Sequence, residues 1–84
     1  MKKSTHSDEY SFVLKKLIDM RKAAGFTQQQ LADALEHEQS FVWRIENGER
    51  RLDVVEFFWV CEALGQDAKA VYAELADAFR KVTR

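Results

Sequence analysis

Three glycines and the absence of proline set the strongest limit on what this 84-residue chain can fold into. The glycines, Gly25, Gly48 and Gly65, each follow a stretch in which apolar residues recur every three to four positions. Such a stretch is typical of an amphipathic helix, and a glycine directly after it is typical of the left-handed residue that ends a helix. The glycines therefore divide the chain into helical segments, and no alternating pattern typical of a strand interrupts them.

Five helices are predicted from these segments. Two of them begin at capping boxes, in which the first side chain accepts a bond from an amide three residues later and the later side chain reaches back. Thr27 with Gln30 forms one box, and Asp53 with Glu56 forms the other. Ser7 is the expected N-cap of the first helix. The expected helices span about 8–24, 27–35, 39–47, 53–64 and from 67 onward, so the predicted class is all-α.

Length and composition indicate a single folded domain. A chain of 84 residues has room for one core, and 46% hydrophobic with 32% charged residues is the balance of a globular protein. We expect the domain to span residues 8–82, preceded by a flexible tail at residues 1–7. No stretch is long and apolar enough to act as a signal peptide or to cross a membrane, so a cytoplasmic protein without membrane contact is predicted.

The sequence favours neither an enzyme nor a metal protein. It contains no glycine-rich phosphate loop, no Cys-His or Ser-His constellation at catalytic spacing, and no Cys or His pair at metal-ligand spacing. The single cysteine, Cys61, cannot form an intramolecular disulfide and is expected in the core together with Phe57 and Phe58. We therefore expect no catalytic residues, no metal and no cofactor.

The segment from Thr27 to Asn47 has the pattern of two short helices joined by a three-residue turn, Glu36-His37-Glu38. Helices of about eight residues are too short to be stable alone, and in a bundle they usually serve as a presented surface. At about 100° per residue, Val42 and Ile45 of the second helix point inward. The opposite side carries four polar or aromatic residues: Ser40, Trp43, Arg44 and Asn47.

The residue types on this outward side match those that read DNA. Glutamine can pair with adenine through two hydrogen bonds, arginine pairs with guanine in the same way, and serine can contact either base. Gln39, Ser40 and Arg44 are therefore predicted base contacts. Gln28 and Asn47 lie at the ends of the segment, where side chains suit contacts to phosphate that fix the register on the duplex. The predicted partner is double-stranded DNA.

This segment resembles the phage repressor and Cro family of regulators, often called the XRE type, in two runs: Thr27-Gln28-x-x-Leu31-Ala32-x-x-Leu35 and Gln39-Ser40-x-Val42-x-Arg44-Ile45-Glu46-Asn47-Gly48. The resemblance extends over about residues 13–71 and implies five helices around one core. It also implies a transcriptional regulator, expected to be a repressor, that places its third helix in the major groove as a homodimer. Gln39, Ser40 and Arg44 match the family's base-contacting positions, and Gln28 and Asn47 match its phosphate-contacting positions.

Further site residues follow from the same resemblance. Arg21 and Glu46 match positions that in this family often form an ion pair between the first and third helices. Trp43 replaces a small or polar residue, so it fits a base contact, a sugar-backbone contact or a contact with protein. Arg50 and Arg51 fit phosphate contacts and ordinary solvated charges equally well.

A homodimer contact is predicted on the fourth and fifth helices. Val55 and Trp59 lie four residues apart on the side that the resemblance leaves exposed, and exposed apolar pairs often mark an interface. We expect them to pair with the outer face of the fifth helix, taken as Tyr72, Leu75 and Phe79. The two recognition helices of the dimer would then lie about 34 Å apart, one turn of DNA.

A second function remains open from the sequence. The net charge of −1, the acidic residues Glu36 and Glu38 in the turn and the unusual Trp43 favour a helix-turn-helix module that binds protein, such as an antitoxin or anti-repressor, with weak affinity for DNA. Contacts to phosphate require clustered lysine and arginine, which a net acidic chain must place asymmetrically. A DNA-binding assay at low salt separates the two functions.

Overall fold

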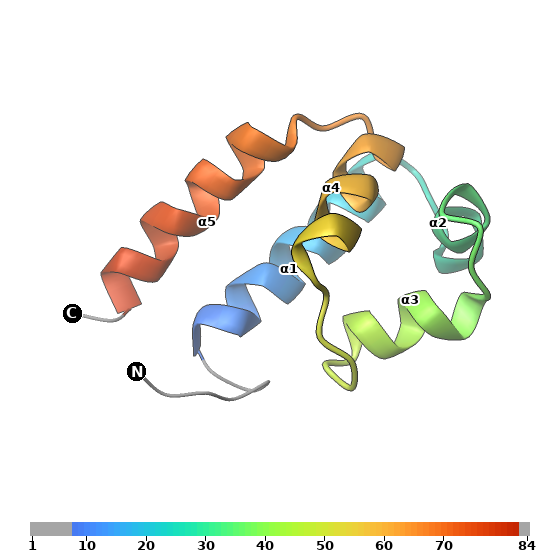
Figure 1. Cartoon of the computed structure of the whole chain (residues 1–84), viewed down its shortest axis with the longest axis horizontal. Helices are drawn as coiled ribbons and strands as arrows, with labels where there is room; N and C mark the ends of the chain where they lie inside the picture. Colours follow the sequence, from blue (N-terminus) through green and yellow to red (C-terminus); the bar gives the residue numbers. More distant parts are fainter. Residues whose placement is uncertain (1–7, 83–84) are drawn as a thin grey trace.

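The computed structural model describes residues 8–82, which form five α-helices and no strand (Figure 1). The helices are α1 (Asp8–Ala23), α2 (Gln28–Ala34), α3 (Gln39–Glu46), α4 (Val54–Ala63) and α5 (Ala68–Val82). The predicted all-α class and the number of helices are confirmed for this range. The predicted tail at residues 1–7 and the predicted N-cap Ser7 lie outside the described residues.

The helix ends have the caps that the sequence predicts. Thr27 Oγ1 accepts from the amide of Gln30 at 3.0 Å, and Gln30 Oε1 accepts from the amide of Thr27 at 2.8 Å. The second box is also complete, because Asp53 and Glu56 exchange the same two bonds at 2.7 and 3.0 Å. Each glycine that follows a helix has a left-handed backbone, with φ between +73° and +77°. Expected helix limits differ from the observed ones by at most one residue, mainly because cap residues are included in the expected helices.

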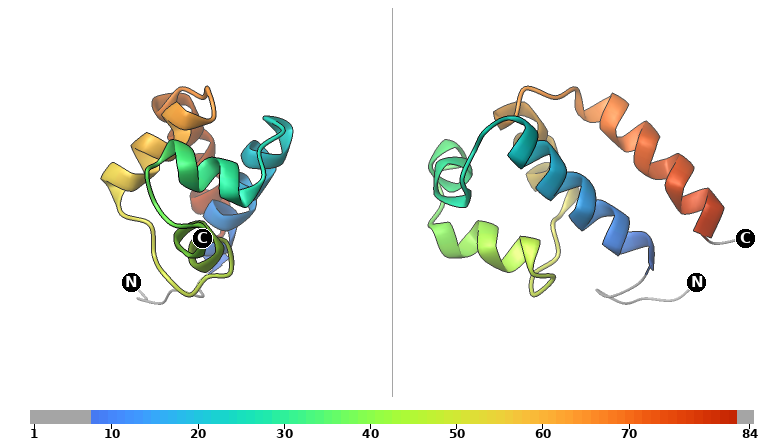
Figure 2. Two further views of the ribbon diagram at one scale, coloured as in Figure 1. Left: turned by 90° about the vertical axis from the view of Figure 1, so that its right-hand side faces the viewer. Right: turned by 180° about the vertical axis from the view of Figure 1, so that it is seen from behind.

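α2 and α3 lie together at one end of the molecule, while α1 and α5 run side by side along its length (Figures 1 and 2). α4 packs against α5 and α2, and α3 also contacts α1. The short pair α2–α3 is thus supported by the longer helices behind it, as expected for helices that are too short to be stable alone. One long side of α3 remains uncovered by the other helices.

One apolar core lies between all five helices. Its buried members come from every helix: Leu17, Met20, Leu31, Ala32, Val42, Ile45, Val60, Cys61, Leu64, Val71 and Leu75. The inward positions predicted for Val42 and Ile45 are confirmed, since they are 2% and 4% exposed. Burial of a side chain of this size stabilises the fold by about 1.5–3 kcal/mol.

Three expectations about burial are wrong. Leu75 was expected on the outer face of α5, but it is buried in the core because it lies one turn after Val71 on the inward side. Phe79, one further turn along, is half-buried and packs against the same core. Phe58 was expected in the core, but it is 43% exposed, because it lies on the outer side of α4.

Cys61 is fully enclosed, with none of its surface exposed. Burial raises the pKa of its thiol to about 11, so the reactive thiolate is scarce at neutral pH. Within residues 8–82, no helix combines the length and apolar character needed to span a membrane. The same range holds no group of three or more potential metal ligands.

Candidate nucleic-acid interface

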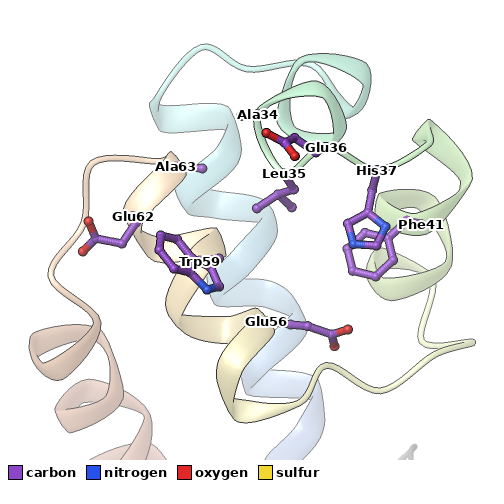
Figure 3. A pocket seen from close by; sticks show the side chains of 9 residues that line it. All are labelled: Ala34, Leu35, Glu36, His37, Phe41, Glu56, Trp59, Glu62 and Ala63. Atoms are coloured by element: carbon purple, nitrogen blue, oxygen red, sulfur yellow. The ribbon is translucent and has the colours of Figure 1, made fainter.

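The turn between α2 and α3 determines how the two helices meet. Glu36 has φ +59°, in the left-handed region that glycine adopts freely and that costs other residues about 1 kcal/mol. The amide of His37 donates to the carbonyl of Ala32 at 2.9 Å, which closes the end of α2. The His37 ring stacks on Phe41 of α3, with the ring centroids 3.8 Å apart (Figure 3). The acidic turn therefore has a glycine-type backbone and is tied to α3 by an aromatic contact.

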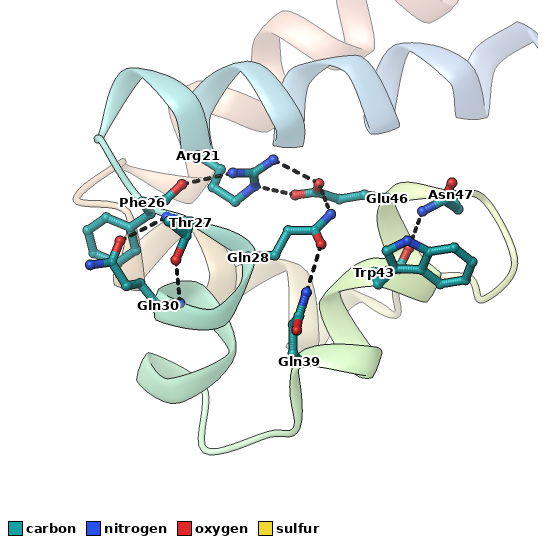
Figure 4. A network of polar contacts seen from close by, with 9 residues as sticks. All are labelled: Arg21, Phe26, Thr27, Gln28, Gln30, Gln39, Trp43, Glu46 and Asn47. Carbon is teal, nitrogen blue, oxygen red and sulfur yellow. Dashed lines mark hydrogen bonds and ion pairs between the residues drawn. The ribbon is translucent and has the colours of Figure 1, made fainter.

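A mostly buried ion pair joins α1 to α3, between the two residues that the family resemblance singled out (Figure 4). Arg21 Nε donates to Glu46 Oε2 at 2.6 Å, and Arg21 Nη2 donates to Glu46 Oε1 at 3.0 Å. The remaining nitrogen, Nη1, donates to the carbonyl of Phe26 at 2.8 Å. The two side chains are only 12% and 6% exposed. Because a bidentate pair restricts both distance and angle, α3 is held in one orientation on α1.

The same carboxylate begins a chain of hydrogen bonds that ends on α3. Gln28 Nε2, from the start of α2, donates to Glu46 Oε1 at 2.9 Å. Gln39 Nε2, from the start of α3, donates to Gln28 Oε1 at 3.3 Å. Figure 4 shows the three side chains in a row along one flank of α3. Gln28 thus has a structural role that its sequence position alone does not reveal, and its contact with phosphate stays a prediction.

The uncovered side of α3 carries the residues that were predicted to face outward. Ser40, Trp43, Arg44 and Asn47 are all exposed, and Trp43 retains 44% of its accessible surface. Asn47 Nδ2 donates to the carbonyl of Trp43 at 2.8 Å, which caps the end of α3. Within residues 8–82, the guanidinium of Arg44 has no hydrogen-bonding or ionic partner. Its donors therefore point to solvent, available to a ligand.

Arg50 is engaged within the protein. Its Nη1 and Nη2 donate to the two carboxylate oxygens of Glu56 at 2.9 and 2.8 Å, and Nη1 also donates to the carbonyl of Arg51 at 3.0 Å. The guanidinium lies 4.9 Å from the ring centroid of Phe41. The hydrogen bonds to Glu56 raise the pKa of Arg50 and lower the pKa of Glu56. Arg51 is exposed and lies 4.6 Å from the ring centroid of Tyr10.

Charge near α3 is mixed. Exposed carboxylates at Glu36, Glu38 and Glu49 lie close in sequence to the uncovered side of α3. Several basic side chains elsewhere are held by carboxylates, in the pairs Lys15–Asp19, Lys16–Glu74 and Arg80–Asp77. Within residues 8–82, the surface therefore has no broad excess of positive charge. Attraction of the protein to phosphate depends on individual basic side chains.

The outer face of α4 is apolar over a wider area than the sequence suggested. Val55 and Trp59 are 60% and 56% exposed, as expected, and Tyr72 on α5 is 55% exposed. Val54 and Phe58 join them, at 80% and 43%. The rings of Phe58 and Trp59 meet edge to face, with centroids 4.9 Å apart. The sequence holds two neighbouring apolar pairs at four-residue spacing, Val54 with Phe58 and Val55 with Trp59. Only the second pair was predicted to be exposed.

Comparisons with known proteins agree with this geometry. A family model described as a helix-turn-helix domain matches residues 16–80. Among solved structures, an XRE-family like protein from Pseudomonas syringae pv. tomato str. DC3000 is similar, with a TM-score of 0.83 and 44% sequence identity. The match covers 87% of this chain and 89% of that chain. No curated protein matches.

Proposed function

Because the chain belongs to the XRE type of helix-turn-helix regulators, which bind DNA, we propose that it represses transcription by placing α3 in the major groove of a two-fold symmetric operator. The observation that carries this proposal is the guanidinium of Arg44, which has no partner within residues 8–82 and lies on the uncovered side of a helix that α1 and α2 hold in place. A side chain with this geometry can donate two hydrogen bonds to guanine without first breaking an internal contact.

Gln39, at the start of α3, is the second proposed base contact beside Arg44. Its amide is already oriented by Gln28, which in turn is fixed by Glu46. An oriented side chain loses less rotational freedom on binding, so more of its interaction energy with adenine remains as affinity. Ser40 and Trp43 lie beside these two residues and complete the proposed base-contacting set.

Contacts to phosphate are proposed for Gln28, Asn47 and Arg51, with Arg50 contributing through the part of its side chain that Glu56 leaves exposed. Few basic side chains take part, and the exposed carboxylates of the turn oppose them. We therefore expect a modest affinity that falls steeply as salt rises.

The test begins with selection of bound sequences from a random pool of duplexes, followed by measurement of variants on the selected site. Arg44→Ala should weaken specific binding by about 1–3 kcal/mol and relax the preference at one base pair. Lys69→Ala removes the same charge from α5 and serves as the matched control, which should leave that preference unchanged. An equal loss for Arg44→Ala on every sequence would contradict the base-reading role.

Homodimerisation is proposed through exposed apolar side chains of α4 and α5, namely Val54, Val55, Phe58, Tyr72 and the edge of Trp59 that lies beside Phe58. The face of Trp59 turned towards the α2–α3 turn stays outside this contact. Leu75 takes no part because it is buried in the core. Covering these exposed apolar side chains is favourable at about 25 cal/mol per Å². Sedimentation should therefore give a dimeric mass at micromolar concentration, and Val55→Glu should give a monomeric one. A monomer in both cases would refute the dimer.

A protein-binding module with weak affinity for DNA is the second candidate. The exposed Trp43 and the carboxylates of the turn favour it, because aromatic side chains with an acidic surround suit a protein partner better than a polyanion. Anisotropy measured on random duplexes at low salt separates the two functions. Absence of any binding under those conditions would exclude the repressor proposal.

A further inference from the structure

An open groove of about 580 Å³ lies between the α2–α3 turn and α4 (Figure 3). Its floor is apolar and formed by Ala34, Leu35 and Ala63. Trp59 stands on one side, and the stacked rings of His37 and Phe41 stand on the other. This volume lies in the range of sites that bind small molecules.

The rim of the groove is acidic. Three glutamates are among its lining residues: Glu36, Glu56 and Glu62. Glu56 is neutralised by its bidentate bonds to Arg50, whereas Glu36 and Glu62 have no hydrogen-bonding or ionic partner within residues 8–82. The three glutamates and Arg50 together carry a net charge of about −2.

We propose that this groove binds a small organic cation that carries an aromatic or bulky apolar body. The apolar floor takes the body, the face of Trp59 attracts the positive charge, and the negative charges of Glu36 and Glu62 add to that attraction. Charge complementarity excludes nucleic acid and small anions from the same place. The groove is distinct from the proposed base-contacting surface, since none of its lining residues belongs to the proposed base contacts.

Occupation of the groove would affect the reading helix. Glu36 and His37 form the turn that precedes α3, Phe41 belongs to α3 itself, and Trp59 belongs to α4. A bound cation would therefore link the turn to α4 and relieve the repulsion between Glu36 and a nearby phosphate. The groove is in the position of an effector site, and the expected effect is tighter binding of DNA when the cation is present.

Isothermal titration calorimetry without DNA tests the binding step, with tetraphenylphosphonium as the probe. Tetraphenylborate, in sodium buffer, is nearly identical in size and shape but carries the opposite charge. We expect the cation to bind at least about tenfold more tightly than the anion, because the two charges experience the same rim with opposite sign. Equal affinity for the two probes, or no binding of the cation, would overturn the proposal.

Substitutions locate the site. Glu36→Gln and Glu62→Gln should each weaken binding of tetraphenylphosphonium by about fivefold, while Glu9→Gln, which makes the same charge change on α1, should not. Trp59→Ala should weaken it by about tenfold. Urea denaturation of each variant records whether the fold is retained, and the two surface glutamine variants keep the test valid if Trp59→Ala unfolds. Equal effects of Glu9→Gln and Glu62→Gln would assign the binding to net charge alone and reject the groove.

These measurements contain no DNA, so their failure is distinguishable from failure of the repressor proposal. The linked measurement adds the probe to the anisotropy assay on the selected duplex. Tighter binding of wild-type protein, lost in Glu62→Gln, is the expected result. Unchanged affinity for DNA in the wild type, despite saturation of the groove, would refute the effector role.

Discussion

Two arginine–glutamate pairs support α3 and its loop, and they differ in burial rather than in chemistry. In both pairs the arginine donates two hydrogen bonds to one carboxylate and a further bond to a backbone carbonyl. The side chains of Arg21 and Glu46 are 12% and 6% exposed, whereas those of Arg50 and Glu56 are 40% and 21% exposed. The same contact should therefore contribute very differently to stability, because solvent screens the second pair and is excluded from the first.

The largest expected effect comes from breaking the buried pair on one side. Arg21→Met should lower the free energy of unfolding by about 3–5 kcal/mol, because Glu46 is left as a buried charge without its partner and the carbonyl of Phe26 loses its donor. Urea denaturation at neutral pH measures this change. A loss below about 1 kcal/mol would mean that the buried pair is no more important than an exposed one.

The second expected effect is smaller because both charges are removed together. The double variant Arg21→Met with Glu46→Leu should be more stable than Arg21→Met alone, since no uncompensated charge remains. It should still be about 1 kcal/mol less stable than wild type, because the amide of Gln28 loses its acceptor. Full additivity of the two single changes in a double-mutant cycle would show that the pair does not act as a unit.

The smallest expected effect belongs to the more exposed pair, Arg50 with Glu56. Glu56→Gln retains the capping bond to the amide of Asp53 but removes the charge, so it should cost only about 0.5–1 kcal/mol at neutral pH. The pKa of Glu56 is lowered in the folded protein, mainly by its hydrogen bond from Arg50. Its stabilising contribution is therefore fully present above the unfolded pKa, near 4.5, and is lost as the pH falls through the lowered folded value.

Denaturation of wild type and Glu56→Gln across pH 7 to about 2 checks this dependence. The difference in stability between them should be constant near neutral pH and should disappear in acid. A difference that grows as the pH falls would show that the charge of Glu56 is unfavourable in the folded state.

The sequence predicts local features of this fold well. The capping boxes at Thr27 and Asp53 depend on residues three positions apart, and the glycine ends of the helices depend on single residues. Residues close together in the sequence are therefore enough to predict these helix ends. The Arg21–Glu46 pair joins residues 25 positions apart, and it was anticipated only because the family resemblance supplies the packing of the first helix on the third.

Contacts that depend on the path of a loop were missed. Arg50 and Glu56 meet because the chain between α3 and α4 turns back on itself, and no periodic pattern describes such a path. Gln39 and Gln28 meet because the left-handed Glu36 sets the angle between their helices. The misplacement of Leu75 has a different cause: Tyr72 and Leu75 were assigned to one face, although the four-residue step from Val71 to Leu75 places Leu75 on the inward side.

The enclosure of Cys61 has a practical consequence for work on this protein. It is the only cysteine in the sequence, and a buried thiol with a pKa of about 11 reacts very slowly with maleimides. A cysteine introduced at an exposed position such as Lys69 would therefore be the only site that takes up a dye, without replacement of the native residue. Donor- and acceptor-labelled molecules prepared in this way could be mixed to test, by energy transfer, whether the proposed dimer forms and exchanges its subunits.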